Sequence, residues 1–212
     1  MNDLDMSEHR AIVKALIDGW TSYPIDDSTK AVKDVMHKLC RKYLGKLGAE
    51  YYGTLQSDDG KKYHEWLLDV VWYLKTKKEE RGMFLGLESE WCDKVNEVAS
   101  DFCKLLAVKA PLKIIVFEAG TATRYKAKDH IKELNRIGRT WRQHSKGDLL
   151  YAINFHDSRC ETYFYEIEKD GSNPSFKLEI ISDLSAKTSD SLTSTPTHPL
   201  HPRPPARRHS GA

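Results

Sequence analysis

Apolar side chains recur at helical spacing near the start of the chain. One face of the segment from about Ser7 to Trp20 carries Ile12, Val13, Leu16 and Ile17. A period of about 3.6 residues indicates an amphipathic helix. The segment from about Ser28 to Leu47 repeats the pattern, and Gly48 follows directly, where glycine commonly stops a helix. Two N-terminal helices within about residues 7–47 are therefore predicted.

Beyond these helices the pattern changes to short apolar runs separated by turn residues, which is typical of strands. Strands are predicted near residues 51–55, 64–74, 82–91, 112–119, 149–157 and 161–169. Helical periodicity returns near residues 93–108 and 127–145. The continuously apolar run LKIIVFEA (112–119) is typical of a strand buried on both faces. Strands that alternate with helices predict an α/β fold, here an α+β mixed sheet with helices on both faces.

The composition divides the chain at Ser182. From there to the end the sequence is rich in Ser, Thr, Pro and His and nearly lacks large apolar residues. Such a segment cannot bury enough surface to offset its conformational entropy. We therefore predict a single α/β domain over residues 1–181, with its core over about 51–169, and a disordered tail over 182–212.

The overall charge excludes little. The formal net charge is +2, which neither demands nor excludes a nucleic-acid partner. No run reaches the roughly 18–20 apolar residues that span a bilayer, and the first residues, MNDLDMSEHR, are polar and acidic. The four cysteines are scattered singly, without the CxxC spacing of a zinc or redox site. A cytoplasmic protein without a membrane partner is expected.

One carboxylate interrupts a strongly apolar run in the strand predicted at residues 64–74. Asp69 lies within WLLDVVWY (66–73), where its neighbours favour full burial. An ionised carboxylate that is buried alone is prohibitively costly, so Asp69 must be paired, protonated or bound to a metal. The alternative is an aspartate at a strand end that backbone amides or a basic side chain satisfy. The pattern alone favours neither interpretation.

Two more carboxylates follow on the next predicted strand. Because side chains alternate along a strand, Glu88 and Glu90 point to one side and lie roughly 6.5–7 Å apart at the backbone. If this strand pairs with that of Asp69, roughly 4.8 Å away, the three carboxylates converge. Such an oxygen site suits Mg²⁺ or Mn²⁺. An exposed edge with two solvated glutamates is the alternative.

The middle of the chain has a known order of elements. Its strands are LLDVVWY, LGLESEW and LKIIVF, and the helix that carries DFCKLL lies between the last two. Over roughly residues 63–157 the chain resembles the PD-(D/E)xK, or restriction-endonuclease-like, nuclease superfamily. The resemblance implies a restriction-endonuclease-like core, with a central mixed β-sheet flanked by helices. It also implies hydrolysis of phosphodiester bonds, with DNA favoured over RNA as the substrate and Mg²⁺ or Mn²⁺ as the cofactor. Its metal-binding positions correspond here to Asp69, Glu88 and Glu90.

The chain departs from the superfamily pattern at two positions. Leu68 precedes the aspartate where proline is common, and Glu90 stands where the catalytic lysine usually stands, which makes the chain a Glu-x-Glu variant. Some restriction endonucleases of the superfamily carry Glu-x-Glu there. In other relatives a lysine from the following helix takes the role, for which Lys94 and Lys104 are the candidates here. A member that has lost catalysis is a third interpretation.

The predicted helix over 127–145 carries its cations on one side. Within an arc of about 120°, at about 100° per residue, lie Lys128, Lys132, Arg136, Arg139, Arg142 and Lys146. A basic stripe on a nearly neutral protein fits a phosphate backbone, and a solvated cationic face is the alternative. A homodimer is allowed by these observations and not required by them.

Two functions remain open at this point. The first is a metal-dependent endonuclease, with Asp69, Glu88, Glu90 and Lys104 as catalytic residues. The second is a non-catalytic regulator on the same fold that binds nucleic acid or a protein. Removing Asp69 is expected to leave folding intact or to improve it, because one member of a repelling acidic cluster is lost.

Overall fold

The structure is a computed structural model, which describes residues 6–20, 28–44, 49–53, 67–75, 80–119, 126–144, 148–156, 159–166, 175–179 and 181. Several features of the sequence analysis lie outside the described residues, among them Gly48, the first part of the strand predicted at 64–74, residues 167–169 of the last predicted strand, Lys146, and the tail over 182–212.

Both N-terminal helices are confirmed. Helix α1 covers Met6–Trp20 and helix α2 covers Ser28–Leu44. Their apolar stripes join one core cluster, in which Ile12, Leu16 and Val32 are fully buried. The periodic pattern therefore identified the faces that pack as well as the helices themselves.

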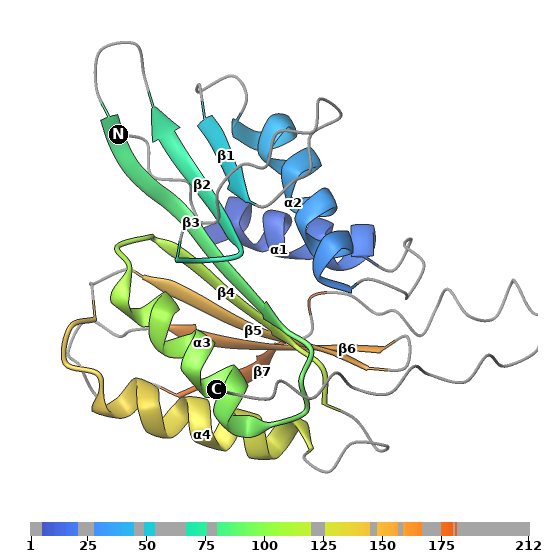
Figure 1. Ribbon diagram of the computed structural model, residues 1–212, viewed down its shortest axis with the longest axis vertical. Helices are drawn as coiled ribbons and strands as arrows, with labels where there is room; N and C mark the ends of the chain where they lie inside the picture. The colour runs from blue at the N-terminus through green and yellow to red at the C-terminus, as the bar shows by residue number, and fades with distance from the viewer. Residues whose placement is uncertain are drawn as a thin grey trace, which may run out of the picture.

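The described strands form one mixed sheet in the order β1 to β7 (Figure 1). Their bounds are β1 Ala49–Gly53, β2 Val70–Lys75, β3 Glu80–Glu90, β4 Leu112–Phe117, β5 Leu149–His156, β6 Arg159–Glu166 and β7 Lys177–Glu179. β3, β4 and β5 run parallel, and every other neighbouring pair is antiparallel. The mixed sheet is therefore confirmed. The short edge strand β7 was not predicted, because its three residues, KLE, carry no apolar alternation.

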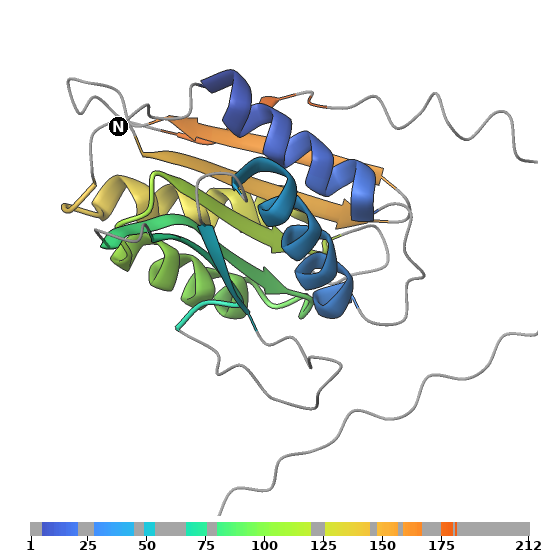
Figure 2. The same cartoon turned by 90° about the horizontal axis from the view of Figure 1, so that it is seen from above.

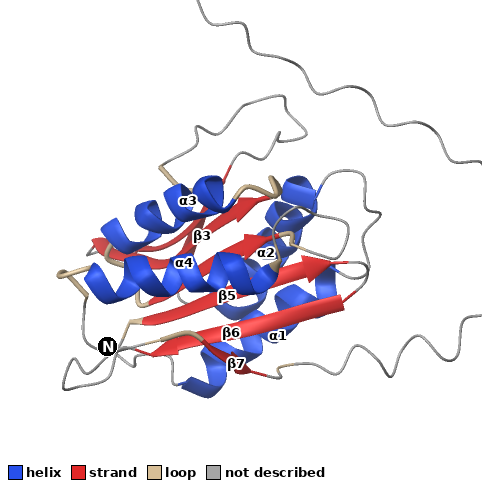
Figure 3. Ribbon diagram, turned by 90° about the horizontal axis from the view of Figure 1, so that it is seen from below, coloured by secondary structure: helices blue, strands red, loops and turns tan. Residues whose placement is uncertain are grey.

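Helices cover both faces of the sheet, as predicted. α1 and α2 lie on one face, whereas α3 (Val95–Ala107) and α4 (Ala127–Thr140) lie on the other (Figures 2 and 3). Each face has its own core: Val70, Leu87 and Val116 point toward α1 and α2, whereas Val71 and Ile115 point toward α3 and α4. This alternation follows from the two-residue repeat of a strand.

Helices α3 and α4 are the crossovers that make the centre of the sheet parallel. α3 connects β3 to β4, and α4 connects β4 to β5. All three strands therefore end at the same edge of the sheet, where Glu90, Phe117 and His156 are their last residues. In open sheets with such crossovers this edge commonly carries the functional site.

Two predicted boundaries are wrong. β2 begins at Val70, so Asp69 precedes the strand and lies in a bend. α4 ends at Thr140 instead of near residue 145, because Trp141 adopts extended backbone angles (φ −72°, ψ 120°). Side chains at this end of α4 contact backbone carbonyl oxygens of its last turn. Thr140 Oγ1 donates to the carbonyl of Ile137 at 2.9 Å, and His144 Nε2 lies 2.7 Å from that of Gly138.

Candidate active site between β2 and β3

Asp69 and Glu88 lie opposite each other where β2 begins and β3 approaches its end. The register pairs Val70 with Leu87, so one step further along the two antiparallel strands Asp69 meets Glu88. The backbone N–H of Asp69 donates to Glu88 Oε2 at 3.3 Å. The structure therefore brings together two of the carboxylates that the sequence singled out.

The Asp69 carboxylate is held by groups from two other elements. Its Oδ2 accepts hydrogen bonds from the backbone N–H of Ser89 at 2.8 Å and from Ser89 Oγ at 2.9 Å. Its Oδ1 lies 3.2 Å from Nζ of Lys33, a lysine of α2 whose side chain is only 8% exposed. Asp69 is thus a strand-end aspartate satisfied by an amide, a hydroxyl and an ammonium group, which was the alternative interpretation of its position.

Glu88 is the more deeply buried carboxylate, with its side chain 4% exposed. It shares the α3 side of the sheet with Ile115, its partner in the β3–β4 register. Lys104 Nζ of α3 forms an ion pair with its Oε1 at 3.2 Å. Burial, followed by the charges of Asp69 and Asp101, raises the pKa of Glu88 to about 7, and the charge of Lys104 opposes this rise.

Lys104 bridges two carboxylates. Besides Glu88 it contacts Asp101 Oδ1 at 2.7 Å, one helical turn earlier on α3. Burial lowers the pKa of Lys104, but its contacts with Asp101 and Glu88 outweigh that effect and raise the pKa above the ordinary value. Lys104 therefore stays protonated at neutral pH. Its side chain is 38% exposed, so it can reach solvent as well as Glu88.

Glu90 is held by the backbone that follows β3. It is half-buried, and its Oε1 accepts the backbone N–H of Cys92 at 2.7 Å. Burial raises its pKa, with smaller contributions of the same sign from Asp101 and Glu97, whereas the bond from Cys92 lowers it. In the part of the chain that the structure describes, no three His, Cys, Asp or Glu side chains lie close enough together to hold a metal ion. The expected convergence of three carboxylates is therefore absent from this arrangement, because each carboxylate has a nearer partner.

Sequence analysis missed three residues of this site: Lys33, Ser89 and Asp101. A signal for Lys33 was available, since it lies at helical spacing from the buried Met36 and Cys40 and so places a cation on the apolar side of α2. Ser89 and Asp101 carried no such signal, because a serine between two glutamates and an acidic residue on an amphipathic helix are ordinary features.

The predicted basic stripe lies apart from these carboxylates. Along α4, Lys128, Lys132, Arg136 and Arg139 are exposed, and Arg142 is exposed beyond the end of the helix. α3 packs over β3 and β4, whereas α4 packs through His130 on Phe117 of β4 and through Gly138 on Tyr165 of β6. α3 therefore lies between the stripe and the β2–β3 site.

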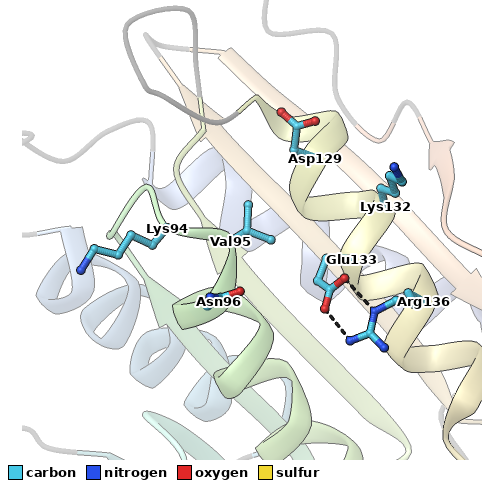
Figure 4. Close-up of a pocket in the computed structure, with 7 residues that line it drawn as sticks. All are labelled: Lys94, Val95, Asn96, Asp129, Lys132, Glu133 and Arg136. Carbon is cyan, nitrogen blue, oxygen red and sulfur yellow. Dashed lines mark hydrogen bonds and ion pairs between the residues drawn. The ribbon is translucent and has the colours of Figure 1, made fainter.

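A pocket of about 640 Å³ lies between the start of α3 and α4, lined by Lys94, Val95, Asn96, Asp129, Lys132, Glu133 and Arg136 (Figure 4). The guanidinium group of Arg136 is already engaged there, since its Nη2 and Nε lie 2.6 and 2.8 Å from the two carboxylate oxygens of Glu133. Glu133, one turn before Arg136 on α4, is therefore the partner of one of the stripe's cations.

No protein-family model matches the chain, and comparison with curated proteins gives no match. Among solved structures, NucC of P. aeruginosa in its cAAA-bound form is similar, with a TM-score of 0.45 and 9% identity over 85% of this chain and 87% of that chain. The cAAA-bound form of E. coli NucC gives a TM-score of 0.42 and 13% identity over 87% of this chain and 88% of that chain. The case for an activity therefore comes from the residues of the site. Among the described helices, none is both long and apolar enough to cross a bilayer.

Proposed function

We propose that the chain is a metal-dependent nuclease with a restriction-endonuclease-like core. It hydrolyses phosphodiester bonds, and DNA is favoured over RNA as its substrate. The observation that carries the proposal is the placement of Asp69 against Glu88 at the junction of β2 and β3. The order of elements supports it. The superfamily resemblance implies a strand, a second strand with Glu-x-Glu, a helix and an apolar strand, and β2, β3, α3 and β4 follow this order.

In this proposal, Asp69 and Glu88 would hold the divalent cation, which would displace the lysines that now pair with them. The donors are oxygen atoms of Asp69 and Glu88, which Mg²⁺ and Mn²⁺ prefer. An ammonium group lies 3.2 Å from each carboxylate, so this place already attracts positive charge. Glu88 Oε1 is buried and its contact with Lys104 is an ion pair at 3.2 Å, which a divalent cation would replace. When bound, Mg²⁺ or Mn²⁺ supplies Lewis-acid polarisation of the scissile phosphate.

The remaining side chains have separate tasks in this proposal. Lys33 and Ser89 hold the Asp69 carboxylate in position, and Lys104, which stays charged, pairs with the phosphate when it leaves Glu88. Glu90 accepts the proton of the attacking water, for which a raised pKa is suited because a general base works best with a pKa near the operating pH. Lys104 thereby takes the place of the lysine that Glu90 replaces.

A cleavage assay tests the proposal. Supercoiled plasmid DNA is incubated with the full chain and Mg²⁺ or Mn²⁺, with EDTA as the blank. We expect nicking that Asp69→Asn and Glu88→Gln abolish. Asp18→Asn, which changes an exposed i,i+4 ion pair on α1, is the matched control and should cleave as the wild type does. Protein that binds Mn²⁺ and cuts neither DNA nor RNA under any of these conditions would overturn the proposal.

A non-catalytic binding protein on the same fold is the second candidate, and one observation favours it. Both carboxylates already have a lysine, Lys33 for Asp69 and Lys104 for Glu88, so the site is electrically compensated by the chain itself. Calorimetric titration with Mn²⁺ separates the two functions. A protein that binds no Mn²⁺ at millimolar concentration, yet binds DNA equally well with and without EDTA, is a regulator of this kind.

A further inference from the structure

One edge of α2 leads directly to the candidate active site. Lys33 is the residue of α2 that reaches Asp69. With it, Lys30, His37 and Arg41 fall within an arc of roughly 80°, at about 100° per residue. Lys30 and Arg41 are exposed, His37 is half-buried and Lys33 is buried. The edge therefore runs from the carboxylate site out to the protein surface.

Neighbouring side chains on this edge of α2 interact electrostatically. Burial, followed by the charge of Arg41, lowers the pKa of His37, and the charge of Asp34 opposes this effect. Arg41 thus lies within electrostatic reach of His37, one turn away on the same edge. We name Lys30, Lys33, His37 and Arg41 the α2 basic edge.

α2 is more basic than the helix that the sequence singled out. Between Ser28 and Leu44 it carries five Lys and Arg residues against one acid, Asp34. α4 carries four against two acids. Of these two helices, α2 contacts the carboxylate site through Lys33, whereas α3 separates α4 from it.

We infer that the α2 basic edge is the surface along which the phosphate backbone of a nucleic-acid duplex approaches Asp69. The inference takes the identity of the partner, a nucleic acid, from the proposed function. It adds the surface of the protein on which that nucleic acid binds. A duplex lying on this edge places its phosphates against Lys30 and Arg41 and brings one strand to the β2–β3 junction. Contacts of this kind position a duplex without reading its bases.

Paired charge reversals test the inference on the full chain. The first variant is Lys30→Glu with Arg41→Glu, two exposed residues outside the proposed catalytic set, and the matched control on α4 is Lys128→Glu with Arg139→Glu. Binding of a fluorescent DNA duplex is measured by anisotropy in EDTA over a series of salt concentrations. We expect the α2 variant to bind the duplex about tenfold more weakly than the wild type. The slope of log K against log salt concentration should become shallower by about two units, since each lost phosphate contact removes about 0.9. The α4 variant should change affinity less than about twofold.

Because binding is measured without metal, its outcome is independent of cleavage. Loss of affinity in the α4 variant alone, or in neither variant, would overturn the inference while leaving the nuclease proposal open. Loss in the α2 variant from a protein that never cleaves would support the inference and remove only the catalytic function. The milder pair Lys30→Gln with Arg41→Gln repeats the test if the reversals unfold the protein, and it should lose affinity in the same direction.

Discussion

The amide of Asp69 donates to Glu88 Oε2 at 3.3 Å, while the carboxylate of Asp69 turns back to the N–H and hydroxyl of Ser89. The two residues therefore meet through a backbone group of one and the carboxylate of the other. Each carboxylate has its own lysine, one from α2 and one from α3, on opposite faces of the sheet. In the nuclease proposal, metal binding competes with these two ion pairs, and the pairs can be tested one at a time.

Removal of the Asp69 side chain should destabilise the protein, in contrast to the expectation from sequence. Asp69→Ala deprives a lysine that is 8% exposed of its carboxylate and Ser89 of its acceptor. A loss of roughly 2–4 kcal/mol in the free energy of unfolding is expected, measured by urea denaturation in EDTA. Adding Lys33→Met to Asp69→Ala should recover part of that loss. Equal stability of Asp69→Ala and the wild type would show that the pair contributes nothing.

The stability of the protein should depend on Glu88 between about pH 4.5 and 7. Its pKa is raised to about 7, from an ordinary value of 4.5, first by burial and then by Asp69 and Asp101. In that window the folded protein keeps a proton that the unfolded chain has released, so the free energy of unfolding falls as the pH rises. The effect of this group is at most about 3 kcal/mol.

Glu88→Gln isolates this effect, because the amide does not titrate. In urea denaturation between pH 4.5 and 8 with EDTA, the variant should gain stability relative to the wild type as the pH increases. Contributions from all other groups cancel to first order in the difference between the two proteins. Parallel pH profiles would mean that Glu88 titrates normally in the folded state.

Lys104 should oppose metal binding and yet support cleavage. Its ammonium group lies 3.2 Å from Glu88 Oε1, where it competes with a cation. At pH 8.5, above the pKa of about 7 that Glu88 has in the wild type, Lys104→Ala should bind Mn²⁺ on the order of tenfold more tightly, or about 1.4 kcal/mol, by calorimetry. Its cleavage rate should fall at least about tenfold, because the phosphate loses a charged partner. The exposed Lys109, just beyond α3, provides the control Lys109→Ala. An unchanged Mn²⁺ affinity would contradict the competition.

Glu90 can be replaced by the residue that the superfamily usually carries at this position. Asp101 and Glu97 both act on the Glu90 carboxyl group, so a lysine there gains two acidic neighbours. Glu90→Lys should therefore fold with a stability within about 1 kcal/mol of the wild type and keep part of the cleavage activity. Glu90→Leu, of similar burial but without charge, should lose most of it. The reverse order of activities would show that a polar side chain at position 90 takes no part in the reaction.

The sequence by itself determined most of the secondary structure. The apolar periodicity located α1, α2 and α3, and the continuous run that became β4, to within two or three residues at nearly every end. These elements depend on local spacing and on one buried face, which a sequence displays directly. The end of α4 was missed because it depends on contacts of Thr140 and His144, and neither contact has a periodic signature.

The sequence also determined that Asp69 needs a partner, since an ionised carboxylate in an apolar run cannot be left alone. Only the tertiary structure decided which partner it has. Side-chain alternation fixes direction inside a strand, but Asp69 lies one residue before β2, where the chain bends and hydrogen bonds set the direction of the side chain. Lys33 comes from a helix on the face opposite to α3, and no spacing along the chain relates it to Asp69. The packing of α2 on the sheet brings the two charges together.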